Sequence, residues 1–224
     1  EGGVFSVQPV VRQTNVDGSA LTSSTTKCTA NCASDVNNCG ILSGSMKLPA
    51  ADNQGEFSVD YTNLKITDSA GAGFRLTFTC GEQSVDSGIF DVSPASIAFA
   101  TAVGGPLVAG AAFGTQPVVK LVKADGTSLL STHRDVSISV VKHSGDGELR
   151  TGESSACDSS ADCVVAVSVG NASFADLRVW NAGASNVVLR FASSPGGPTV
   201  DSATLTVSPK VAVTTDPGGA TTTT

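Results

Sequence analysis

The sequence predicts an all-β protein made of two consecutive β-sandwich units. Apolar and polar residues alternate in several short runs, for example over 136–140, 165–169 and 187–191, as expected for strands with one buried face. Turn sequences such as Asp17-Gly18 and Asp125-Gly126 separate these runs, at the spacing typical of short-strand sandwiches. Aromatic residues are scarce and Val, Ser, Thr, Ala and Gly are abundant, so strands are favoured and helices are not expected.

An internal repeat sets the domain organisation. Residues 5–11, Phe-Ser-Val-Gln-Pro-Val-Val, return at a shift of 108 as residues 113–119, Phe-Gly-Thr-Gln-Pro-Val-Val. The aromatic and aliphatic positions of residues 61–78 return at a shift of 113, and Val92-Ser93-Pro94 returns at a shift of 115. The copies therefore differ by loop insertions. We predict a first domain over 1–94, a second over 95–209, and a C-terminal segment over 210–224.

Each copy contains about seven predicted strands, the number found in immunoglobulin-like sandwiches. The order of motifs, Gly-Gly, Gln-Pro-Val-Val, Asp-Gly, Gly-x-Leu-x-x-Gly and aromatic-x-x-Leu, resembles the tandem immunoglobulin-like repeats of large secreted bacterial and algal surface proteins, including adhesin stalks. The resemblance covers nearly the whole chain. It implies a β-sandwich fold and an extracellular scaffold role, and it implies no catalytic or binding residues.

The first copy lacks the strand that opens the second. Residues 96–105, Ser-Ile-Ala-Phe-Ala-Thr-Ala-Val-Gly-Gly, precede the second Gln-Pro-Val-Val segment and alternate as a strand before a Gly-Gly break. The chain begins at the position that matches residue 109, so no counterpart of this strand is present. The edge that it would cover is expected around four apolar residues: Val4, Phe5, Val7 and Val10.

A second version of the opening strand follows the second copy. At a shift of 114, Gly104-Gly105 matches Gly218-Gly219, and the strand 97–101 matches a segment formed by Val211, Ala212, Val213, Thr214 and Thr215. We therefore predict a structural subunit of an extracellular filament, in which residues 210–219 of one copy complete the first domain of the next. Donor and acceptor lie at opposite ends, so the contact is heterologous and produces an open homopolymer.

Two other interpretations remain open at this stage. The 224 residues could be one period of a longer continuous array, in which residues 210–219 simply open the next domain of the same chain. Alternatively, the chain could be a two-repeat segment of a secreted adhesin or stalk whose loops bind surface glycans or proteins. Separate subunits are the favoured interpretation, because a stalk has no need of an unpartnered strand that matches a gap in its own first domain.

The cysteines and the glycosylation signals agree with an extracellular location. An even number of cysteines, six, lie in loop-like surroundings without a zinc-type C-x2-C spacing, so disulfides are expected. Cys157 and Cys163 share one loop; the remaining four allow three connectivities, among them Cys32 with Cys39 and Cys28 with Cys80. The candidate sugar attachment sites are Asn171, in an Asn-Ala-Ser sequon, and the Thr-rich end, Thr221, Thr222, Thr223 and Thr224. A frayed terminus would explain the Thr-rich end equally well.

Composition argues against several other functions. The net charge of −7 comes without an acidic run, and the 13 Lys and Arg are scattered, which argues against nucleic-acid binding.

No apolar run is long enough for a membrane span and no signal sequence precedes Glu1, so a mature soluble chain is expected. The two histidines, His133 and His143, lie in no triad or metal motif, so we predict no enzyme activity, cofactor or metal. Asp146, Asp158 and Asp162 fit no calcium-loop spacing.

Overall fold

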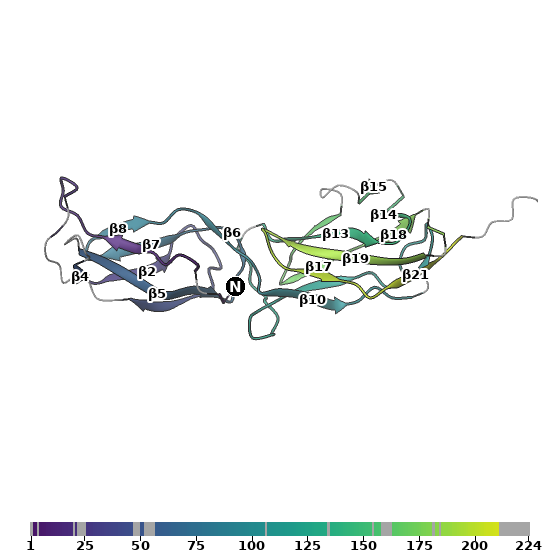
Figure 1. Ribbon diagram of the computed structural model, residues 1–224, viewed down its shortest axis with the longest axis horizontal. Coiled ribbons are helices and arrows are strands. Elements are labelled where there is room, and N and C mark those ends of the chain that lie inside the picture. Colours follow the sequence, from purple (N-terminus) through teal and green to yellow (C-terminus); the bar gives the residue numbers. More distant parts are fainter. Residues whose placement is uncertain are drawn as a thin grey trace, which may run out of the picture.

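The computed structural model describes residues 2–3, 5–19, 21, 26–46, 50–51, 57–105, 107–133, 135–153, 155–157, 163–180, 182–183 and 185–210. Within these residues every regular element is a strand, so the all-β prediction is confirmed. We refer to residues 2–95 as the N-terminal half and to residues 96–210 as the C-terminal half. Figure 1 shows the two halves end to end along the long axis, with β8 near one end and β21 near the other.

The N-terminal half contains the first nine strands. They are β1 (Val10–Arg12), β2 (Cys28–Cys32), β3 (Ile41–Met46), β4 (Ala50–Ala51), β5 (Phe57–Thr67), β6 (Gly71–Phe74), β7 (Leu76–Cys80), β8 (Gln83–Asp86) and β9 (Phe90–Val92). Their sheets have the orders β1-β5-β3, with β4 on β5, then β2-β7-β8, and β6-β9. Alternation of side chains places one face of each sheet in a common core, which includes Val59, Ile66, Phe74 and Phe78.

The C-terminal half contains the remaining strands. They are β10 (Ser96–Thr101), β11 (Leu107–Val108), β12 (Val118–Val122), β13 (Ser137–Ser144), β14 (Glu148–Thr151), β15 (Ser155–Ala156), β16 (Val164–Ala166), β17 (Asn171–Ser173), β18 (Leu177–Trp180), β19 (Ser185–Ser194), β20 (Thr199–Asp201) and β21 (Leu205–Ser208). Their sheets have the orders β10-β12-β17, β11-β21-β19-β13-β16, with β20 on β19, and β15-β14-β18. A second buried cluster includes Leu121, Ile138, Leu189 and Phe191.

The sequence repeat is reproduced in strand register. Val11 of β1 pairs with Val59 of β5, and the matching residues Val119 and Ala172 pair in the C-terminal half. The same holds in the second sheet, where Phe78 of β7 pairs with Val85 of β8 and Phe191 pairs with Val200. A shift of one residue in the pairing register would move every buried side chain of a strand to the exposed face. The agreement in register therefore establishes which residues of the two halves correspond.

The Asp-Gly turns predicted from the sequence are formed in both halves. Asp17 accepts hydrogen bonds from the backbone N–H and the hydroxyl of Ser19, at 2.9 and 2.6 Å. Asp125 accepts the equivalent pair from Thr127. The hydroxyl and backbone donors lower the pKa of both carboxyl groups, because they stabilise the ionised form. Gly18 and Gly126 have φ of +82° and +85°, a conformation that favours glycine.

The glutamine of the Gln-Pro-Val-Val motif ties its segment to the neighbouring strand. The Gln116 amide donates to the carbonyl oxygens of Phe113 and Leu177, each at 3.2 Å, and its Oε1 accepts from the backbone N–H of Leu177 at 2.9 Å. Gln8 makes the same contacts with Phe5 and Leu64. One side chain therefore satisfies several backbone groups that would otherwise lose partners on burial.

Replacing Gln116 with Leu is expected to lower the free energy of unfolding by about 2 kcal/mol, since the partly buried Leu177 N–H and two carbonyls lose their partner. Urea unfolding followed by Trp180 fluorescence measures the change. Gln8→Leu is the matched control, because it removes the equivalent contacts in the N-terminal half and should leave the Trp180 transition in place. Equal stability of Gln116→Leu and the wild-type chain would contradict this role.

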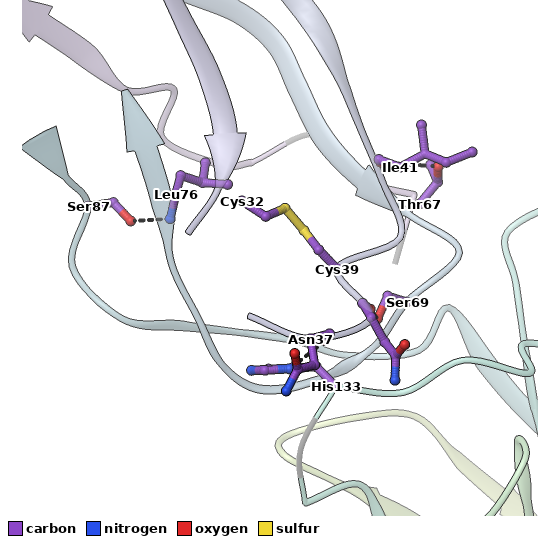
Figure 2. Close-up of a disulfide and its surroundings, with 10 residues drawn as sticks. Cys32, Asn37, Cys39, Ile41, Thr67, Ser69, Leu76, Ser87 and His133 are labelled. Atoms are coloured by element: carbon purple, nitrogen blue, oxygen red, sulfur yellow. Dashed lines mark hydrogen bonds between the residues drawn. A yellow bond between two sulfur atoms is a disulfide. The ribbon is translucent and has the colours of Figure 1, made fainter. Parts of the chain in front are cut away.

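The two halves contact each other through a small polar joint. The backbone N–H of His133 donates to the Ala70 carbonyl at 2.8 Å. The ring Nδ1 of His133 donates to the backbone carbonyl of Asn37 at 2.6 Å. Figure 2 shows His133 beside Asn37, close to the Cys32–Cys39 disulfide. Lys123 and Asp68 form an ion pair of 2.7 Å, which is part-exposed and contributes little by itself. His133 thus has a structural role at the joint.

Candidate functional site

The two halves differ at the outer edge of β1. In the C-terminal half, β12 lies between β17 and the opening strand β10. Its counterpart β1 pairs with β5, and β1 is the edge strand of its sheet among the strands that the structure describes. The register of β10 on β12 places Ile97 opposite Leu121 and Phe99 opposite Val119. The matching positions on the N-terminal half are Gln13 and Val11.

The opening strand supplies core side chains where it is present. Ile97 is only 6% exposed and belongs to the buried cluster of the C-terminal half. The ring of Phe99 packs edge-on against Phe191, with 5.2 Å between ring centroids. Phe191 also contacts Phe174 at 5.3 Å, and this pair has a counterpart in Tyr61 and Phe78 at 5.2 Å. Among the ring contacts of the N-terminal half that the structure describes, none places a third aromatic on Phe78 as Phe99 is placed on Phe191.

Two hollows lie in the N-terminal half where β10 lies in the C-terminal half. The outer hollow, about 640 Å³, is bordered by residues 11–16 of the β1 segment and by residues 83–85 of β8. The inner hollow, about 360 Å³, is bordered by residues 5–7 and Pro9, and by Phe90 and Asp91 of β9. Phe78 borders both hollows. We call the two hollows together the groove.

Apolar side chains around the groove are more exposed than their counterparts. Val10 is 56% exposed and Val85 is 55% exposed, whereas the matching Val118 and Val200 are only partly exposed, and Val200 packs on the core. Phe5 is half-buried, but its counterpart Phe113 is 5% exposed. A strand that covered Val10 and Val85 would stabilise the N-terminal half by roughly 25 cal/mol for each Å² of apolar surface that it removed from water.

The groove is suited to an extended peptide. Its walls are two strand edges, β1 and β8, whose backbone groups can continue a ladder. Val, Phe and Leu form the largest group among the residues that border it, and the others include polar residues such as Gln13 and Thr14 and two charged residues, Arg12 and Asp91. Gln13 donates to the Thr26 carbonyl at 3.0 Å. An occupant with small apolar side chains at alternate positions would match this surface.

A disulfide lies at the outer end of the groove. Cys28 of β2 and Cys80 of β7 are directly opposite each other in the ladder and are bonded, and Cys80 borders the outer hollow. The matching residues in the C-terminal half, Ile138 and Ser193, also pair across two strands but have no such bond. The structure also contains Cys32–Cys39, shown in Figure 2, and Cys157–Cys163. These are the pairs considered in the sequence analysis.

The acceptor residues expected from the sequence lie partly at the groove. Phe5 and Val7 border the inner hollow, and Val10 is exposed on β1. Val4 lies outside the described residues, as do the donor segment 211–215 and Thr221 to Thr224. Sequence reasoning missed the opposite wall, formed by Phe78, Val85 and Phe90. The signal was present, because Val85 matches Val200 and Phe78 matches Phe191 in the repeat.

The other residues singled out from the sequence lie at separate places where the structure describes them. No cluster of His, Cys, Asp or Glu suited to a metal ion occurs in the described part of the chain. His143 contacts Arg190, and Trp180 stacks under the Arg150 guanidinium, 5.2 Å from the ring centre. Asn171 begins β17 and its side-chain amide donates to the Val169 carbonyl at 3.1 Å. Asp158 and Asp162 lie outside the described residues.

Comparison with protein-family models, with curated proteins and with solved structures finds no match for this chain. Across the described residues, no helix has the length and apolar character needed to cross a membrane. The groove therefore has to be interpreted from the chain itself, with the C-terminal half as its internal reference.

Proposed function

We propose that the protein is a structural subunit of an extracellular filament. In this proposal each half is an immunoglobulin-like sandwich, and residues 210–219 of one subunit occupy the groove of the next. The observation that carries the proposal is the groove itself, which lies where β10 completes the other half. The tail supplies a matching sequence, since Val211 and Val213 correspond to Ile97 and Phe99. The disulfides are typical of proteins from oxidising compartments.

Strand polarity makes the assembly head-to-tail. β10 runs antiparallel to β12, with Ser96 opposite Val122 and Thr101 opposite Val118. An equivalent strand in the groove would begin beside Thr14 and run towards Val10. Thr14 borders the outer hollow together with β8, and β8 lies at the opposite end of the molecule from β21 (Figure 1). The occupant that follows β21 therefore comes from a second copy, and the repeated contact is heterologous and open.

The energetics favour insertion once both surfaces are counted. Burying Val211 and Val213 contributes roughly 1.5–3 kcal/mol each, and each ladder hydrogen bond adds about 0.5–1.5 kcal/mol. Ordering the donor backbone costs about 1–2 kcal/mol per residue, so the donor alone nearly breaks even. The acceptor supplies the difference, because the inserted strand also covers Val85, which borders the outer hollow, and Val10 on β1; both are more than half exposed.

Deleting residues 210–224 is expected to abolish filaments, because the donor strand is lost while every described strand of both halves is kept. Val211→Asp or Val213→Asp should also block assembly, since a carboxylate would be buried in the groove without a partner. Thr214→Asp is the matched control, because the corresponding Ala100 is exposed, and it should still assemble. Negative-stain microscopy and sedimentation measure the outcome.

Filaments that persist after deletion of residues 210–224 would overturn the proposal. The mass of the denatured chains separates the proposal from a continuous array: subunits held by inserted strands dissociate to single chains, whereas a continuous array gives higher multiples. A uniform monomer with the full tail and a folded second half would favour a stalk or adhesin segment instead.

A further inference from the structure

In the C-terminal half the opening segment contributes to two sheets. After β10, Gly104 and Thr115 exchange backbone hydrogen bonds of 3.3 and 3.0 Å. The chain then turns at Gly105, whose φ is +89° and which lies close to Gly114. It continues as β11, which runs parallel to β21, with Leu107 opposite Val207. Leu107 is 7% exposed and belongs to the core, so this second short strand helps to close the half.

The N-terminal half has an open edge at the position that corresponds to β21. Phe74 pairs with Phe90 as Val187 pairs with Leu205, so β9 is the counterpart of β21. Whereas β21 lies between β19 and β11, β9 is the edge strand of a two-stranded sheet in the part of the chain that the structure describes. The inner hollow opens beside β9, where Phe90 and Asp91 form one wall. Val7, at the position of Thr115, is 83% exposed.

We propose that the donor segment crosses from one sheet to the other and adds a second strand, residues 221–222, parallel to β9 of the acceptor. This inference rests on the proposed function and extends it. At the shift that aligns the two opening strands, Gly218-Gly219 takes the place of the Gly104-Gly105 crossing, and Thr221-Thr222 takes the place of Leu107-Val108. Threonine is β-branched and suits a strand. Val108 is 37% exposed, so the hydroxyl of Thr222 at the same position would reach water.

In this arrangement each part of residues 211–222 would contact a different part of the acceptor. The strand 211–215 would fill the groove with apolar side chains. The Gly-Gly crossing would pass beside Val7, as Gly104 passes beside Thr115. Thr221 would lie where a buried Leu107 lies in the C-terminal half, so the second strand contributes ladder hydrogen bonds more than apolar burial. Contacts on two sheets at once would also prevent rotation of one subunit about the inserted strand.

Filaments of the chain without residues 220–224 test this inference. They should form, because the first strand is intact, but they should release subunits about tenfold faster on dilution, since two ladder hydrogen bonds are lost. Thr221→Leu, which restores the residue of the C-terminal half, should slow release below the wild-type rate. Release is measured by light scattering after dilution of sheared filaments.

Three results would overturn the proposal that residues 221–222 form a second strand. Equal release rates for the truncated and full chains would exclude it and leave the proposed function intact, whereas filaments that survive deletion of 210–224 would remove the proposed function. An unchanged rate for Thr221→Leu would show that the side chain does not reach the core. A double change, Thr221→Ala with Thr222→Ala, keeps the backbone and removes the hydroxyls; if it released subunits as fast as the truncation, the hydroxyls or attached sugars would be responsible.

Discussion

Replacing Cys28 with Ile and Cys80 with Ser should lower the stability of the N-terminal half by about 4 kcal/mol, because their bond closes a loop with a sequence separation of 52. The replacements are the residues that the C-terminal half has at the same positions, Ile138 and Ser193. That half has an opening strand and needs no bond there. The N-terminal half has an open groove, and the bond beside it holds β2 against β7 when no strand covers them.

Each half carries its own spectroscopic reporter. Tyr61 is the single tyrosine and Trp180 the single tryptophan. Tyr61 is 4% exposed in the core of the N-terminal half, and Trp180 lies on β18 of the C-terminal half. Tyrosine emission from Tyr61 and tryptophan emission from Trp180, which occur at different wavelengths, therefore follow the two halves separately during urea unfolding. In the double cysteine variant the Tyr61 transition should move to lower urea and the Trp180 transition should move little.

A second disulfide supplies the control for this prediction. Cys157–Cys163 closes a loop with a sequence separation of only 6, worth about 2 kcal/mol in the same chain-entropy treatment, and lies in the half that contains the opening strand β10. Its replacement by serines should move only the Trp180 transition. If the Tyr61 transition were unchanged in the Cys28→Ile, Cys80→Ser chain, the bond would have no role in keeping the open half folded.

The repeat explains why so much of the fold could be predicted from the sequence. Alternation and the Asp-Gly turns are local, and the shifts of 108, 113 and 115 carry the strand register from one half to the other, as Val11 with Val59 and Val119 with Ala172 show. The edge at Phe5, Val7 and Val10 followed from the same alignment. These features depend on neighbours in sequence or on a copy of the same segment.

The parts that could not be predicted depend on contacts between distant segments that have no copy. The His133 bond to Asn37 joins residues 96 apart, and no counterpart within the repeat indicates it. The wall of the groove formed by Val85 lies on β8, and its role becomes visible only when β1 and β8 are seen on either side of one hollow. Apolar alternation alone could not distinguish Val85, which is exposed, from Val200, which packs on the core.

Moving residues 210–222 from the C-terminus to a position directly before Glu1 should convert the proposed filament subunit into a stable monomer. Joining Thr222 to Glu1 reproduces the spacing between the Gly-Gly crossing and Phe113, because Gly219 and Phe5 then lie as far apart as Gly105 and Phe113. The donor would fill its own groove, and no strand would remain to fill another. A covalently attached strand also inserts at a high effective concentration, so it should outcompete any strand from a neighbour.

The rearranged chain should unfold at higher urea by the Tyr61 signal, with a gain of about 2–4 kcal/mol, because Val10 and Val85 become covered and the ordering cost of the strand is offset by burial of its two valines. Sedimentation should show a single monomeric species. The control carries Val211→Asp and Val213→Asp in the moved strand, which should stay monomeric, since it has no free tail, but should lose the gain in stability. Filaments from the rearranged chain would mean that surfaces other than the groove hold the subunits together.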